Sequence, residues 1–166
     1  MPVYAKCQVF TPLEYVKKLL NVVGYRNNLY GKKVAENSCG DGNVLIEIVK
    51  RYVKSCLKSN MTINDIRIGL QNDIWAAEID AKHIENCKNR LNKLVEKYNI
   101  YNVNWNILEG DFLKENIANT FDFVVGNPPY ISYKELETSD RNFVRDNYKT
   151  CSNGKFDYCY AFIEAS

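Results

Sequence analysis

Four consecutive residues, Asn127-Pro128-Pro129-Tyr130, combine an amide, a rigid turn and an aromatic ring. They follow the run 121–126, whose aromatic and β-branched residues predict a buried strand that the prolines end. The Tyr130 ring could stack on a planar substrate, while the Asn127 amide oxygen and the Pro128 carbonyl accept hydrogen bonds from its exocyclic NH2 group. An ordinary surface turn is the alternative, because Asn-Pro and Pro-Pro pairs are common in turns.

The segment 36–42 offers a glycine turn that an acidic residue precedes. Gly40 and Gly42 allow the backbone to approach a ligand and to turn sharply into a helix. Leu45 stands where a dinucleotide-binding fingerprint has its third glycine. The Glu36 carboxylate would repel a pyrophosphate and attract a cationic group. A plain tight turn is the alternative here.

Two further acidic residues follow predicted strands. Glu78 could accept hydrogen bonds from both hydroxyls of a ribose, with Ile79 against the base, while Asp80 suits the N-cap of the next helix. Asp111 could accept from an exocyclic amine beside the Phe112 ring, or could cap the following segment. Acidic residues at the ends of three strands, without a loop suited to phosphates, indicate that the ligand is a positively charged nucleoside. S-adenosylmethionine fits that description.

The hydrophobic pattern predicts alternating strands and helices. Helices are expected at 12–23 with Thr11 as N-cap, at 43–56, at 81–97 and from 156 to 165. Strands are expected at 33–37, 74–79, 103–108 and 121–125. Polar connections are expected at 59–73, with a short helical turn, and after residue 130. This alternation predicts a doubly wound α/β fold with a largely parallel sheet, whose ligands bind beyond the carboxyl ends of the strands.

Size and composition indicate one soluble domain of 166 residues, with 46% hydrophobic and 25% charged residues. No run approaches transmembrane length, and no signal-peptide pattern begins the chain. The six cysteines form no C-x-x-C pair and His83 is the only histidine, which argues against a metal site and for a reduced cytoplasm. The net charge of +2 does not by itself indicate nucleic-acid binding.

Three basic residues, Arg141, Arg145 and Lys149, fall at four-residue intervals after the Asn-Pro-Pro-Tyr motif. They could lie in one row and contact phosphates. A solvated helix face explains the same spacing and is the simpler interpretation.

In their order along the chain, these motifs resemble those of amino-group DNA methyltransferases of the γ class, which are specific for adenine N6. The matching segments are 6–12, 36–42, 78–80, 111–112, 127–130 and 155–164. The resemblance is closest to restriction–modification methylases, including those fused to an endonuclease. Two positions depart from the pattern: Cys7 stands where glycine is common, and Asn37, which replaces the usual proline, could loosen the turn.

The resemblance implies a Rossmann-like class I methyltransferase fold with helices on both faces of the sheet, and S-adenosylmethionine as cofactor. The residues around the cofactor would be Thr11, Glu36, Ser38, Gly40, Glu78, Ile79, Asp111, Phe112, Pro129 and Phe162. The Phe162 ring would lie against the cofactor's adenine. Asn127 and Pro128 would hold the target amino group, and Tyr130 would stack on a flipped base, without a metal ion.

The implied partner is double-stranded DNA in the bacterial cytoplasm, without a membrane. The family continues into further strands and a target-recognition domain, so we expect residues 1–166 to be an incomplete catalytic domain that could self-associate through an exposed sheet edge.

Two other functions stay open. Protein-glutamine and RNA N-methyltransferases use a similar Asn-Pro-Pro-Tyr motif, but the short segment before Glu36, with Gln8-Val9-Phe10-Thr11-Pro12, favours DNA. The chain could also be a catalytically incomplete fragment that binds the cofactor.

Overall fold

The computed structural model describes residues 11–115 and 120–166. The first part of the N-terminal motif, including Cys7, lies outside the described residues. The helices are α1 (Leu13–Val22), α2 (Asn43–Lys58), α3 (Ile63–Asp73), α4 (Ala81–Glu96), α5 (Thr138–Asn147) and α6 (Cys159–Glu164). The strands are β1 (Val34–Glu36), β2 (Ile74–Glu78), β3 (Asn106–Glu109) and β4 (Phe123–Val125), and a 3-10 turn, η2, spans Lys149–Cys151.

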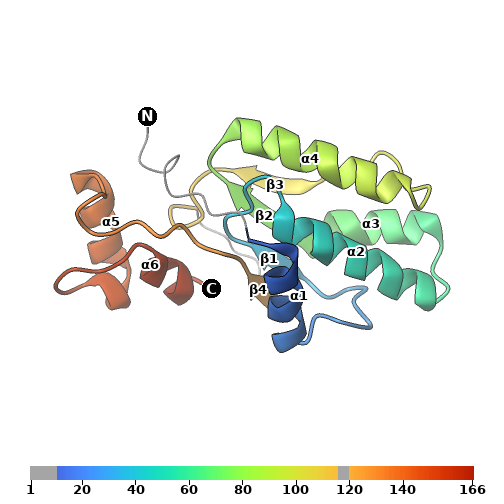
Figure 1. Cartoon of the computed structure of the whole chain (residues 1–166), viewed down its shortest axis with the longest axis horizontal. Coiled ribbons are helices and arrows are strands. Elements are labelled where there is room, and N and C mark those ends of the chain that lie inside the picture. Colours follow the sequence, from blue (N-terminus) through green and yellow to red (C-terminus); the bar gives the residue numbers. More distant parts are fainter. Residues whose placement is uncertain (1–10, 116–119) are drawn as a thin grey trace.

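The described strands form one parallel sheet in the order β3-β2-β1-β4 (Figure 1). The chain runs from β1 outward to β2 and β3, and then returns to the other side of β1 for β4. The strand order therefore reverses at β1. In doubly wound sheets the crevice at such a reversal is where ligands bind. The predicted α/β fold with a parallel sheet is confirmed.

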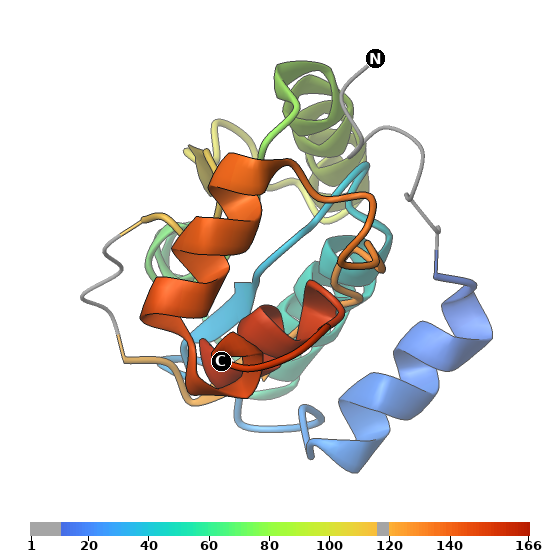
Figure 2. The same ribbon diagram turned by 90° about the vertical axis from the view of Figure 1, so that its left-hand side faces the viewer.

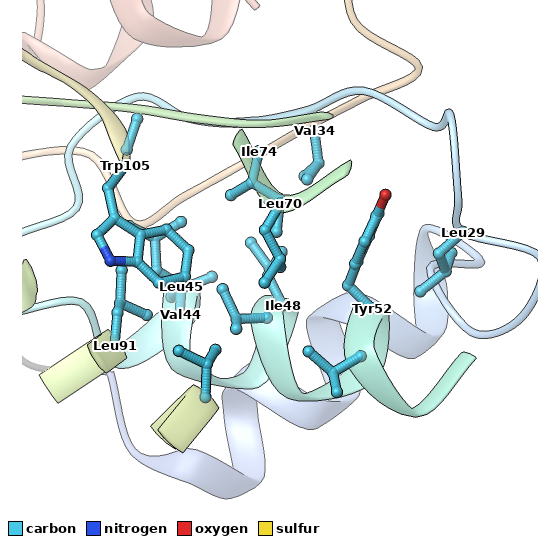
Figure 3. Close-up of a cluster of buried hydrophobic side chains, with 14 of the residues drawn as sticks. Leu29, Val34, Val44, Leu45, Ile48, Tyr52, Leu70, Ile74, Leu91 and Trp105 are labelled. Carbon is cyan, nitrogen blue, oxygen red and sulfur yellow. The ribbon is translucent and has the colours of Figure 1, made fainter. Parts of the chain in front are cut away.

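One face of the sheet packs against α1 to α4. On α2, buried residues recur at helical spacing, such as Leu45, Ile48 and Tyr52. They meet the strand residues Val34 and Ile74 in one apolar cluster. Figure 3 shows these side chains between α2 and the strands. This regular layer is the platform from which the strand ends project.

The opposite face is covered by the C-terminal part of the chain. Successive strand residues point to opposite faces, so Trp75 belongs to a second cluster that includes Phe112, Val144 of α5 and Phe162 of α6. Figure 2 shows α5 and α6 in front of the sheet on this side. The expectation of helices on both faces is confirmed.

The segment 59–73 differs from the expected polar connection. It contains the 11-residue helix α3, whose N-cap is Thr62, with a side chain that accepts a hydrogen bond from the Asp65 backbone N–H. Ile66 and Leu70 are fully buried on one side of α3. The helical period is weak in the sequence, because Ile63 and Ile68 of α3 are apolar but exposed.

Two other local expectations were wrong. Pro12 occupies the N-cap position of α1, and its carbonyl accepts from the Val16 N–H at 3.1 Å, so Thr11 is not the cap. The polar segment after Tyr130 includes the ten-residue helix α5. None of the helices in the two described ranges is long and apolar enough to span a lipid bilayer.

Candidate functional site

A pocket lies at the carboxyl edge of the sheet, where the segments that follow all four strands converge. About 910 Å³ of empty space lies within it, including the open solvent at its mouth. Every residue that the sequence analysis assigned to the cofactor or the target base lines this pocket: Thr11, Glu36, Ser38, Gly40, Glu78, Ile79, Asp111, Phe112, Asn127, Pro128, Pro129, Tyr130 and Phe162. The structure brings these residues together, and their individual roles stay predictions.

Glu36 is the last residue of β1, and only 2% of its surface is exposed. Its Oε2 atom is buried without a hydrogen-bond partner. Burial raises the pKa of Glu36 well above its usual range, and Cys87 and Glu78 raise it further, whereas the Leu45 backbone N–H acts in the opposite direction. A buried acceptor without a donor is unfavourable, so this position suits a ligand that brings a positive charge. The ammonium and sulfonium groups of S-adenosylmethionine meet that requirement.

The turn after β1 requires glycine at position 42 for conformational and steric reasons. Gly42 has a left-handed backbone, with φ of +83°, and a Cβ atom there would lie 2.5 Å from Cys87 Sγ. The Gly42 N–H donates to the Cys39 carbonyl at 2.8 Å and closes the turn. A larger residue would therefore strain the turn and push it away from α4.

Glu78, the last residue of β2, is surrounded by backbone donors. Its Oε2 accepts from the Gly40 N–H at 2.8 Å, and its Oε1 accepts from the Ile79 and Asp80 N–H groups at 3.0 Å each. The carboxylate therefore ties the glycine turn to the end of β2. Since a carboxylate has about four acceptor sites, it can still accept from a ligand hydroxyl. The predicted N-cap role of Asp80 is confirmed, because its side chain accepts from the Lys82 N–H at 2.8 Å.

The segment after β3 forms an aromatic wall beside an acidic group. The Phe112 and Phe162 rings are stacked, with centroids 5.9 Å apart and an interplanar angle of 19°. Asp111 Oδ2 accepts from the Tyr158 hydroxyl at 3.1 Å, and Oδ1 accepts from the Leu113 N–H at 3.1 Å, so the capping alternative also holds. A flat apolar wall next to an acceptor suits a purine ring with an amino group.

The segment 127–130 forms a lip on the pocket, after β4. The Ser38 hydroxyl donates to the Asn127 carbonyl at 3.2 Å and holds this lip against the end of β1. The Tyr130 side chain lies at the mouth and is 59% exposed. Its ring is therefore available to stack on a planar group that enters from solvent.

Polar residues on one face of α4 hold the glycine turn from outside. His83 Nδ1 and Asn86 Nδ2 hydrogen-bond Asp41 Oδ1, and the Arg90 guanidinium donates to the Asp41 carbonyl. Arg90 also donates to Asn43 Oδ1 at 2.9 Å. In the sequence, His83 served only as a reason against a metal site. The spacing of residues 83, 86 and 90, which places them on one helix face, was the feature of the sequence that could have predicted their contact with the turn.

Several other lining residues were not predicted to contact a ligand: Asn37, Cys39, Asn43, Val44, Gly110 and Tyr158. Within the described ranges, no group of three or more His, Cys, Asp or Glu side chains is arranged to hold a metal ion.

The three spaced basic residues do not form one row. Arg141 and Arg145 both place their guanidinium groups over the Tyr133 ring, 5.0 and 5.4 Å from its centroid. Lys149 lies in η2, beyond the end of α5, and its backbone N–H donates to the Glu164 carboxylate at 2.9 Å. The four-residue spacing therefore does not correspond to a single helix face.

Comparisons with known proteins agree with this fold. A protein of Listeria monocytogenes described as a class I S-adenosylmethionine-dependent methyltransferase superimposes with a TM-score of 0.60 at 17% identity, over 97% of this chain and 44% of that chain. The cryo-EM structure of a DrdV–DNA complex gives a TM-score of 0.67 at 14% identity, over 99% of this chain and 19% of that chain. At these identities the likeness shows the fold, which is that of class I methyltransferases.

Sequence comparisons assign the chain to one family within this fold. Residues 24–166 match the Eco57I restriction-modification methylase family, and the chain belongs to this family. The Type II methyltransferase M.BstVI of Geobacillus stearothermophilus is 30% identical over 170 residues, which cover 95% of this chain and 30% of that protein. The chain thus spans about three tenths of the length of the curated relatives it matches.

Proposed function

We propose that this chain forms the cofactor-binding and catalytic part of a DNA methyltransferase that methylates N6 of adenine with S-adenosylmethionine. The observation that carries the proposal is one pocket that holds both Glu36, with one buried oxygen that has no partner, and the Asn127–Tyr130 lip. The first is suited to a cationic donor, and the second to a planar base with an amino group. Membership in a restriction-modification methylase family supports DNA as the partner.

The cofactor half of the pocket would bind by charge and shape. Glu36 would face a positive group of the cofactor, Glu78 would accept from a ribose hydroxyl, and Phe162 would lie against the adenine. Thr11, Ser38, Gly40, Ile79, Asp111, Phe112 and Pro129 would complete the enclosure. When bound, S-adenosylmethionine supplies an electrophilic methyl group on a positively charged sulfur.

The target half would receive a base that has left the duplex. Flipping a base costs a few kcal/mol, and stacking on the exposed Tyr130 ring would offset about 1–3 kcal/mol of it. The adenine amino nitrogen is a poor nucleophile because its lone pair is delocalised into the ring. The Asn127 amide oxygen and the Pro128 carbonyl would accept hydrogen bonds from its two N–H groups. The nitrogen lone pair then becomes available to attack the methyl group. Catalysis would consist of positioning and preorganised dipoles.

The substitution Asn127→Ala tests this mechanism. We expect the variant to keep its affinity for S-adenosylmethionine and to lose methyl transfer by at least about 100-fold, the scale for a preorganised polar contact to a transition state. The assay is transfer of a labelled methyl group to unmethylated DNA, with the chain as given and with the longest reading frame that contains it. Asn64→Ala, on the surface of α3, is the matched control. Unchanged transfer by Asn127→Ala would refute the assigned role.

The same assay separates the competing functions. Label on RNA or on a glutamine-containing protein, with none on DNA, would replace the proposed substrate. Cofactor binding without transfer to any of these acceptors would favour the binding-fragment interpretation. Self-association through an edge of the sheet also stays a prediction, which sedimentation can check.

A further inference from the structure

Asn37, at the end of β1, makes a contact to the distant C-terminal segment. It follows Glu36 and is only 6% exposed. Its side-chain Nδ2 donates to the Ser166 hydroxyl at 3.1 Å, and that hydroxyl donates to the Phe162 carbonyl at 2.6 Å. The side chain therefore reaches the last turn of α6, the helix that carries the Phe162 ring. The expectation that Asn37 loosens the turn does not fit this buried, hydrogen-bonded position.

On its other side, Asn37 meets the lip. Because Glu36 pairs with Val125 in the parallel β1–β4 register, Asn37 and Gly126 are the next residues along the two strands. A Cβ atom at Gly126 would overlap Asn37 Oδ1 and lie 3.7 Å from the Asn37 backbone nitrogen. The amide thus packs directly on the residue before Asn127. A residue larger than glycine there would displace the Asn37 side chain.

These two contacts connect the two halves of the pocket. Phe162 stacks on Phe112 in the cofactor half, and Gly126 directly precedes the lip of the target half. Phe162 and Gly126 are both far from β1 in the sequence. A single buried amide at the end of the central strand lies between them.

We propose that Asn37 is a positioning residue, which holds the Phe162 ring and the lip in the geometry that binds cofactor and base. The identity of the ligand rests on the proposed function, but the link itself rests on the contacts of Asn37. Loss of the amide would free α6 and the lip from the end of β1, while the regular layer of α1 to α4 would be unaffected.

Cofactor affinity and amide exchange test the proposal in the 166-residue chain. We expect Asn37→Ala and Ser166→Ala each to weaken S-adenosylmethionine binding by about 3- to 10-fold, as for the loss of one neutral hydrogen bond. The double variant should match Asn37→Ala, because Asn37→Ala already removes the hydrogen bond to Ser166 together with the contact to Gly126. Ser152→Ala is the control, since its hydroxyl bonds the Lys149 carbonyl outside the pocket.

Hydrogen exchange gives a second readout that a general loss of stability would not reproduce. In Asn37→Ala, peptides covering 126–133 and 159–166 should exchange about 3- to 10-fold faster, while α3 stays unchanged. Ser166 is exposed, so Ser166→Ala keeps the test available if Asn37→Ala fails to fold. Wild-type affinity in both single variants, or an equal rise of exchange in α3, would overturn the positioning role. A wild-type chain that does not bind S-adenosylmethionine would instead overturn the proposed function.

Discussion

The ends of β1 and β2 carry the same residue in opposite surroundings. Glu36 and Glu78 end neighbouring strands, and they are 2% and 6% exposed. Backbone N–H groups from three residues surround the Glu78 carboxylate. An oxygen of Glu36 has no partner, and burial raises the pKa of this carboxyl well above its usual range.

This difference separates a carboxylate whose hydrogen bonds stabilise the fold from one that keeps a buried oxygen without a partner, the group that we propose to face the cofactor's positive charge. Glu78 stabilises the glycine turn because charge-assisted hydrogen bonds to a buried carboxylate are strong. Glu36 opposes folding when it is ionised, because its charge is buried without a counter-charge. Unsatisfied buried groups of this kind are characteristic of binding sites, where stability is lost in favour of function.

The largest expected effect on cofactor affinity is that of Glu36→Gln. The variant removes the negative charge that would face the cofactor's positive group, and the loss of one partner of a buried charge pair costs about 2–5 kcal/mol, or at least about 30-fold in affinity. Calorimetric titration with S-adenosylmethionine measures this loss of affinity. Glu85→Gln, on the exposed surface of α4, is the control. Equal affinities for Glu36→Gln and the wild type would mean that the cation binds elsewhere.

Glu78→Ala should give a smaller loss of affinity together with a loss of stability. Removal of the acceptor leaves the N–H groups of Gly40, Ile79 and Asp80 without their partner. We expect the free energy of unfolding and the cofactor binding energy each to fall by about 1–3 kcal/mol. Denaturant unfolding and calorimetry measure the two quantities. A Glu78→Ala variant as stable as the wild type would remove the contrast between the two glutamates.

The smallest expected effect is a pH dependence that belongs to Glu36. Because its folded-state pKa is raised, the chain loses free energy of unfolding as the pH rises through that pKa, whereas Glu36→Gln does not. Cofactor affinity should change in the opposite direction and increase with pH, since the ionised carboxylate binds the cation. Binding should release up to about one proton, measured by calorimetry in buffers of different ionisation enthalpy. Equal proton release by the wild type and Glu36→Gln would assign the titration to another group.

The regular part of the fold was predictable because periodicity is a local property. The helix expected at 43–56 is observed at Asn43–Lys58, and the strand expected at 74–79 at Ile74–Glu78. Both have apolar residues at the spacing of their secondary structure. Only part of the α3 surface is buried, so the apolar signal in its sequence was too weak to distinguish a helix from a connection. The segment that contains α5 was missed for the same reason.

Local sequence patterns are enough to tell which motifs end the strands, and a parallel sheet necessarily brings such ends to one edge. That is why the residues predicted for the cofactor and the base line a single pocket. Long-range packing sets the rest: Glu78 is hydrogen-bonded while Glu36 keeps an oxygen without a partner, and Asn37 reaches Ser166, 129 positions along the chain. Hydrogen bonds form only within about 3 Å, and which donors come that close to a carboxylate or an amide is set by the packing of distant segments.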